Sequence, residues 1–245
     1  GEFLLTAGFT NASGALLLVE IAIIALQAAR GVPSHFNYAT ALDGAFFAVM
    51  GVGITSMWVI NIFAFVLLLR ERLQSRAMTW AVRAGLLIAL IGMALAFAMT
   101  SPNSAQISAL QAGQKLAQMG AHNVNALADG QTRMLPILGW NLDGGDLRIA
   151  HFVGLHAVQV IPLLALLLRR RRFAWLGAND QAGLVAVGAA TYLGITLMTL
   201  WQALRNESIA APGALTLAAL VAVLVLAAGA GASIIIRARR ATVNA

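Results

Sequence analysis

Six long apolar stretches dominate this chain of 245 residues and restrict what it can fold into. About 20 apolar residues are needed to cross the hydrocarbon core of a bilayer as a helix, and the stretches are of about that length. None of them alternates polar and apolar residues with a period of two, as the strands of a membrane barrel do. We therefore predict an all-α fold, a polytopic transmembrane helix bundle of about six spans that forms one transmembrane domain over residues 1–245. The spans are expected near residues 13–30, 40–69, 77–100, 147–168, 181–203 and 213–236.

The composition agrees with a lipid bilayer as the main partner of this chain. Hydrophobic residues make up 60% of it and charged residues 10%, against roughly 45–50% and 25% in soluble domains. The formal net charge is +7, but the arginines gather at the ends of the apolar stretches and do not form a basic face, which excludes nucleic acid as a partner. Cysteine is absent, so disulfides, thiolate chemistry and zinc–sulfur sites are excluded.

The positions of the arginines predict the orientation. Most of the basic residues follow the second, fourth and sixth spans, and that side is expected to be cytoplasmic. Both ends of the chain are then cytoplasmic, and the long loop over residues 101–146 is periplasmic. The arginines that carry this prediction are Arg70, Arg72, Arg76, Arg169, Arg170, Arg171, Arg172, Arg237, Arg239 and Arg240.

The long outer loop is expected to contain some structure of its own. Within Ser104–Met119, apolar residues recur at helical spacing on one face. This spacing predicts a short amphipathic helix that lies on the membrane surface or caps the bundle, although the segment could also serve as a plain connection. Gly120–Gly145 is rich in Gly, Asn and Asp and is expected to be irregular. Asp146 is expected to be the N-cap of the fourth span.

Polar residues inside the apolar stretches are expected to face the bundle interior, because polar groups are costly in hydrocarbon unless they are paired. Glu20 shares one helical face with Gln27, and Asp43 and Asn61 lie five helical turns apart on one face of the second span. Glu20 and Asn61 are candidates for a proton or ion path. Glu20 could equally make a structural hydrogen bond or lie near the membrane surface. A polar stripe also follows the fifth span, at Tyr192, Thr196, Thr199 and Gln202.

All four histidines, His35, His122, His151 and His156, map to the outer side of the predicted bundle. His151 and His156 are five residues apart, about 140° around a helix, so they cannot bind one small ion as an i,i+4 pair does. One histidine could instead ligate haem iron or a metal, with a second ligand from another helix. Alternatively, the histidines line a pocket, or they only make structural hydrogen bonds at the interface.

The first functional hypothesis is a cofactor site in the outer leaflet that holds haem b or a transition metal and serves electron transfer, with quinone as a possible partner. Its candidate metal ligands are His35, His151 and His156, with Gln159 and Asp43 as further cofactor-binding residues. A second hypothesis is an ion or small-molecule transporter that uses Glu20, Asp43 and Asn61, together with the polar stripe from Tyr192 to Gln202. A third is an accessory subunit of a larger membrane complex. Gly51–Gly53 (GVG) predicts close helix packing and not an ion filter.

Two segments carry a resemblance to other proteins. They are PSHFN at residues 33–37 and GDLRIAHFVGLHAVQVIPLL at residues 145–164. Together they resemble a group of uncharacterised bacterial polytopic inner-membrane proteins, from about the first span through the fifth. The resemblance implies a bacterial plasma membrane, and it implies no catalytic residues.

Overall fold

The computed structural model describes residues 2–71, 73, 75–128 and 132–243, and Arg72 of the predicted cytoplasmic set lies outside these ranges. Within them, six helices are long and apolar enough to cross a membrane, and the only extended pairings are isolated bridges. The chain is thus an all-helical, multi-pass membrane protein, as predicted. Its helices are α1 (Glu2–Ala29), α2 (Ala41–Leu68), α3 (Arg76–Met99), α4 (Ser104–Gln111), α5 (Leu147–Leu168), η1 (Arg171–Phe173), α6 (Ala178–Leu204) and α7 (Ala214–Val243).

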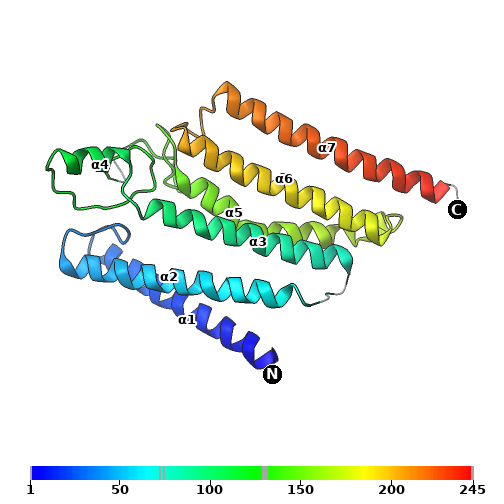
Figure 1. Ribbon diagram of the computed structural model, residues 1–245, viewed down its shortest axis with the longest axis horizontal. Coiled ribbons are helices and arrows are strands. Elements are labelled where there is room, and N and C mark those ends of the chain that lie inside the picture. Colours follow the sequence, from blue (N-terminus) through cyan, green and yellow to red (C-terminus); the bar gives the residue numbers. More distant parts are fainter. Residues whose placement is uncertain (1, 72, 74, 129–131, 244–245) are drawn as a thin grey trace.

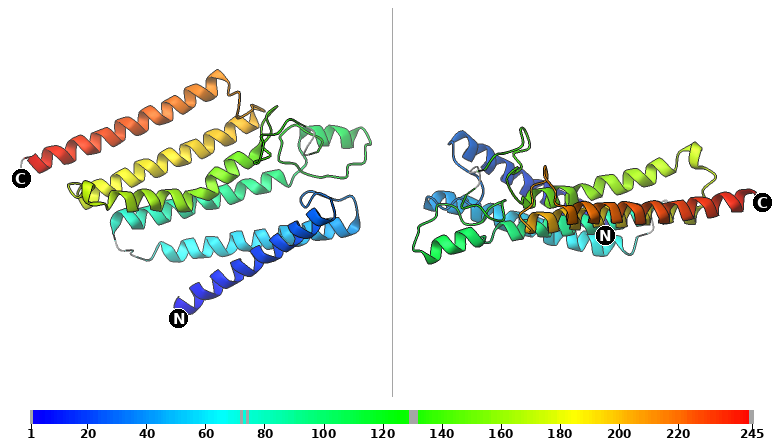
Figure 2. Two further views of the ribbon diagram at one scale, coloured as in Figure 1. Left: turned by 180° about the vertical axis from the view of Figure 1, so that it is seen from behind. Right: turned by 90° about the horizontal axis from the view of Figure 1, so that it is seen from above.

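The six long helices form a flattened bundle (Figure 1). Helices α3, α5 and α6 pack against one another and make its core, α7 packs on α6 at one edge, and α1 packs on α2 at the other. The contact between α2 and α3 is sparse by comparison with the contact between α3 and α5. The right-hand view of Figure 2 shows how thin the bundle is in the third direction. The bundle therefore consists of an α1–α2 pair beside an α3–α5–α6–α7 unit.

Helices α3 and α5 cross at glycines. A Cβ atom on Gly92 would lie 2.7 Å from the carbonyl carbon of Gly154, and one on Gly154 would lie 2.6 Å from the Cα of Gly92. About two turns closer to the start of α3, a Cβ on Gly85 would lie 2.8 Å from the carbonyl oxygen of Ala157. Small residues let helix backbones approach closely in membranes, where van der Waals contact drives association. Glycine is therefore required at this crossing.

The loop over residues 101–146 lies beyond the helix ends on the side opposite the chain termini (Figure 1). Helix α4 begins there with a capping box between Asn103 and Gln106. The Gln106 side chain is fully buried: its Nε2 donates to the carbonyl oxygens of Gly120, at 3.0 Å, and Leu127, at 2.9 Å. The buried Gln106 amide therefore joins separate parts of the loop.

The amphipathic helix predicted over Ser104–Met119 is not confirmed. Helix α4 ends at Gln111, and its buried positions are Gln106 and Ala109. Ile107, which the apolar spacing places on the buried face, is 46% exposed. Hydrogen bonding of the Gln106 amide, and not burial of the apolar face, decides how this short helix packs.

Asp146 is the N-cap of α5, as predicted, and accepts a hydrogen bond from Arg148 N at 2.9 Å. The carboxylate is buried and also pairs with the Arg148 guanidinium at 2.6 Å. The preceding turn lies against the end of α6, where a Cβ on Gly145 would come within 1.9 Å of Ala203 O. These contacts hold the start of α5 between the loop and α6.

The connection from α6 to α7 is built on Glu207. Its carboxylate accepts from Thr216 Oγ1 at 2.6 Å, Arg205 Nε at 2.8 Å and Gly213 N at 3.1 Å. These hydrogen bonds, with the Thr216 hydroxyl first, lower the pKa of Glu207 to about 2. The folded protein therefore stabilises the charged form of the Glu207 carboxyl relative to the unfolded chain.

Glu207→Gln is expected to flatten the acid limb of the stability profile. The carboxyl pKa is about 4.3 in an unfolded chain and about 2 in the folded protein. Its contribution to stability is therefore complete above the unfolded value and is lost as the pH falls from about 4.3 to about 2. The melting temperature in detergent, followed by tryptophan fluorescence from pH 7 to pH 2, should show a wild-type advantage that shrinks across that window. An advantage that is constant with pH would contradict the assignment.

Candidate functional site

A cavity of about 440 Å³ lies between α1, α2, α3 and α5. Its wall is mostly apolar and includes Met50, Met57 and Met93. Four of the polar residues singled out from the sequence also line it: Glu20, Asn61, His35 and His151. The structure therefore brings residues from the first, second and fourth spans, and from the turn before the second, to one place.

Glu20 and His35 face each other in this cavity, with Glu20 Oε1 3.9 Å from His35 Nε2. On the other side of the ring, His35 Nδ1 lies 2.9 Å from Ser34 Oγ. The turn that carries His35 is held by the outer loop, because Met119 N donates to Phe36 O at 3.0 Å. Phe36 has a φ of 57°, a left-handed conformation that is uncommon for a residue other than glycine.

His151 is oriented by the α3–α5 crossing. Its Nδ1 lies 2.7 Å from the carbonyl oxygen of Gly92. A carbonyl oxygen only accepts hydrogen bonds, so Nδ1 carries the proton in this contact, and Nε2 of the neutral ring keeps its lone pair. The His151 side chain lines the cavity and is thus held in one tautomer by the backbone of the neighbouring helix.

His122 joins this region from the outer loop. Its ring centroid lies 5.0 Å from that of Phe36 and 6.5 Å from that of His35. Leu147 N donates to His122 O at 2.9 Å, which ties this part of the loop to the start of α5. The sequence places His122 on the outer side, but no spacing connects it to the other histidines, so it was not among the candidate ligands.

Asp43 does not line the cavity. It is buried at the start of α2, where it accepts from Arg30 Nη1 at 2.7 Å, Gln27 Nε2 at 3.0 Å and Thr40 Oγ1 at 2.6 Å. Arg30 also donates to Gln27. This cluster, which we call the Asp43 clip, joins the end of α1 to the start of α2. The contacts of Asp43 indicate a structural role and not the predicted role beside a cofactor.

His156 and Gln159 lie on another face of α5. They line a neighbouring hollow of about 350 Å³, which shares Asn61, Met93 and Leu155 with the cavity. His156 Nδ1 lies 2.8 Å from Phe152 O in its own helix. The predicted ligand set of His35, His151 and His156 is therefore not brought together, because five residues along a helix turn a side chain to a different face. Among the described residues, no group of three or more His, Asp or Glu side chains is placed to hold a metal ion.

The polar stripe of α6 is used in packing. Tyr192 Oη donates to Val153 O at 2.7 Å, and Gln202 Nε2 donates to Ser208 O at 2.9 Å. The stripe does not reach the cavity that holds Glu20 and Asn61. The residues of the transporter hypothesis are thus divided among the cavity, the Asp43 clip and the contacts of α6 with α5 and with the α6–α7 connection.

The cavity has the usual character of a small-molecule site, with mostly apolar walls and a few converging polar groups. An acid and two imidazoles in such a place can donate or accept hydrogen bonds and exchange protons. No family model matches this chain, and no curated protein and no solved structure shows a significant similarity to it.

Proposed function

We propose that this membrane protein binds a lipid-soluble molecule that carries ring oxygens, with quinones as the leading class, and makes hydrogen bonds to those oxygens. The observation that carries the proposal is the placement of the Glu20–His35 pair and His151 in one apolar cavity among membrane-spanning helices. Ionisable residues inside a membrane are costly and are a default indication of function. The volume of about 440 Å³ is within the usual range of small-molecule pockets, roughly 300–1,000 Å³.

The polar groups suit a ring with two oxygen substituents. His151 Nε2 keeps a lone pair and can accept a hydrogen bond from a hydroxyl of the reduced ring. The Glu20–His35 pair can hold a proton near a second oxygen, since the acid and the imidazole are 3.9 Å apart. The methionines and other apolar residues of the wall would contact the ring itself.

Glu20→Gln is expected to weaken quinone binding by about tenfold, the usual scale for loss of one charge-assisted hydrogen bond. Binding is measured by tryptophan quenching when a short-chain benzoquinone is titrated into the protein in lipid nanodiscs. Glu71→Gln is the matched control, because Glu71 is an exposed carboxyl outside the cavity. Absence of saturable binding to the wild-type protein, or equal affinities of the wild type and Glu20→Gln, would contradict the proposal.

Haem b or a single transition-metal ion is a second candidate, favoured by the contact between His151 and Gly92. Metal-ligating histidines almost always donate their other ring N–H to a carboxylate, carbonyl or water, and His151 Nδ1 makes such a contact at 2.7 Å. His151 would then supply the ligand atom Nε2. His35 is the candidate second ligand.

This candidate predicts a Soret band, or a stoichiometric metal content, in protein purified from cells grown with ample iron. His151→Ala is expected to abolish the signal and His156→Ala to retain it, because His156 lies on another face of α5. A colourless, metal-free wild-type protein would exclude the haem and metal candidate while leaving the quinone proposal standing.

A further inference from the structure

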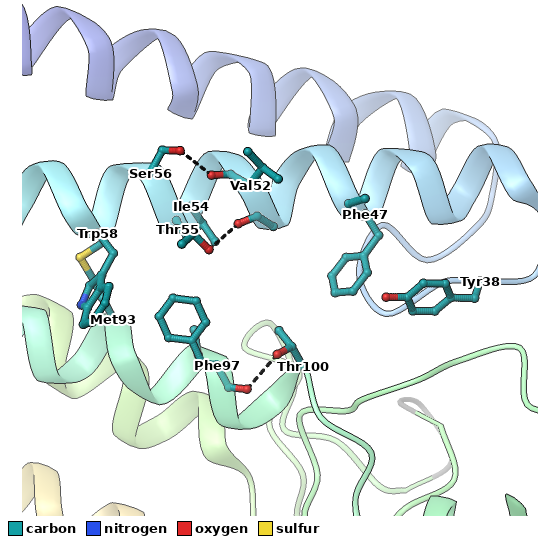
Figure 3. Close-up of a pocket in the computed structure, with 13 residues that line it drawn as sticks. Tyr38, Phe47, Val52, Ile54, Thr55, Ser56, Trp58, Met93, Phe97 and Thr100 are labelled. Carbon is teal, nitrogen blue, oxygen red and sulfur yellow. Dashed lines mark hydrogen bonds between the residues drawn. The ribbon is translucent and has the colours of Figure 1, made fainter.

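A second hollow of about 520 Å³ lies on the seam between α2 and α3 (Figure 3). Aromatic rings line it from Tyr38 and Phe47 at one end to Trp58 and Phe97 at the other. Trp58 Nε1 donates to Leu90 O at 3.1 Å, and the Trp58 ring meets the Phe97 ring edge-on at 5.5 Å. The hollow is therefore a groove walled mainly by carbon.

The threonine and serine hydroxyl groups in this hollow are already used. Thr55 Oγ1 donates to Gly51 O at 2.7 Å, Ser56 Oγ to Val52 O at 2.8 Å and Thr100 Oγ1 to Phe97 O at 2.8 Å, as the dashed lines in Figure 3 show. Each of these hydroxyls donates to a backbone carbonyl oxygen three or four residues earlier in the chain. The groove thus offers a molecule dispersion contacts and little hydrogen bonding, which suits an alkyl or isoprenoid chain.

The groove and the cavity with Glu20 share a wall. Six residues line both: Phe47, Gly51 and Ile54 of α2, and Met93, Ala96 and Thr100 at and after the end of α3. The two spaces are therefore back to back across the sparse α2–α3 contact.

Gly51 lies in the wall that the groove and the cavity share. No heavy atom lies within 4 Å of a Cβ built on Gly51, whereas one on Gly92 or Gly154 would clash with backbone. The close packing predicted for the GVG segment is therefore wrong at Gly51. A glycine in a helix interior is unfavourable unless something requires it, and here the glycine leaves the shared wall open.

We infer that the cavity and the groove hold one ligand, with its polar ring beside Glu20, His35 and His151 and an apolar tail along Tyr38, Trp58 and Phe97. This inference rests on the proposed function and extends it, because it assigns the ligand to the class of ring compounds with a long alkyl or isoprenoid tail. The tail occupies the side of the α2–α3 seam that Figure 3 shows.

Two probes and two matched variants test the inference. The probes are one benzoquinone ring without a tail and the same ring with a decyl tail. Thr55→Phe fills the groove, since Thr55 lines the groove and not the cavity. Val59→Phe adds a ring at an exposed position of the same helix that lines neither space. All affinities are measured in nanodiscs of one composition, so that partition of the tail into lipid is common to every variant.

The wild type and Val59→Phe are expected to bind the tailed probe at least about tenfold more tightly than the tail-less one. Thr55→Phe is expected to lose this advantage. Gly51→Leu places a side chain in the shared wall, where a Cβ has no heavy atom within 4 Å, and it should weaken the binding of both probes at an unchanged or higher melting temperature. If Thr55→Phe kept the wild-type advantage, the groove would hold membrane lipid and the inference would be overturned, with the proposed function intact. If the wild type bound neither probe, the inference and the proposed function would both be contradicted.

Discussion

Gly154→Leu is expected to prevent the protein from reaching a folded state that survives in detergent. Gly154 lies against the Cα of Gly92, and a Cβ would also meet Thr196 Cγ2 of α6 at 3.4 Å. The added side chain would have to separate α3 from α5, the two helices that share the most contact. Even Gly154→Ala is expected to cost about 3 kcal/mol, the upper end of ordinary overpacking. The measurement is the monodisperse yield by fluorescence-detected size exclusion, with the melting temperature where protein is recovered.

Gly229→Leu in α7 is the matched control, because a Cβ there meets no atom within 4 Å. It makes the same chemical change in a membrane-spanning helix and is expected to leave the yield near that of the wild type. Equal yields of Gly154→Leu and Gly229→Leu would contradict the close α3–α5 crossing. The loss of this crossing would also separate His151 from Gly92, so the proposed binding site depends on it as well.

Asp43→Ala is expected to lower the melting temperature by about 10 °C, because removing the buried carboxylate of a partly buried ion pair leaves its partners without compensation. The fully buried Gln27 amide and the Arg30 guanidinium would both lose the carboxylate. The double variant Arg30→Ala/Asp43→Ala should lose less than the two single variants added together, as expected for residues in direct contact. Thermal unfolding in detergent, followed by tryptophan fluorescence, measures each variant.

Asp143→Ala is the control for this prediction. Asp143 pairs with Arg133 at 2.7 Å in the outer loop, where the Arg133 side chain is 80% exposed, and exposed pairs contribute little to stability. The melting temperature of the Asp143→Ala protein is expected to lie no more than about 3 °C below that of the wild type. An Asp43→Ala protein with wild-type stability and weakened quinone binding would contradict the clip and support the role that the sequence predicts for Asp43.

The membrane spans could be predicted from the sequence because hydrocarbon thickness sets their length. The fourth span, predicted at residues 147–168, is α5 at Leu147–Leu168, and its N-cap Asp146 was also predicted. The outer loop could not be predicted in the same way. Its fold depends on the buried Gln106 amide, whose partners Gly120 and Leu127 are distant in sequence. The orientation of the spans in the membrane stays a prediction.

The cavity could be predicted in part. Helical spacing predicts Glu20 and Asn61 on inward faces, and the positions of His35 and His151 in the chain predict that both lie on the outer side of the bundle. Periodicity cannot say which faces of different helices meet. That depends on the Gly92–Gly154 crossing, which directs His151 to the cavity and turns His156 away from it.

The sparse contact between α2 and α3 has a mechanical consequence. The walls of the cavity and the groove come from two units, the α1–α2 pair and the α3–α5–α6–α7 unit. The connection from α2 to α3 joins the units at one end, and the outer loop contacts the turn between α1 and α2 at the other. A small rotation of one unit against the other would change the width of the proposed binding site without disturbing the glycine crossing. Bilayer thickness and lateral pressure act on such a seam, so occupancy of the site is expected to depend on the length of the surrounding acyl chains.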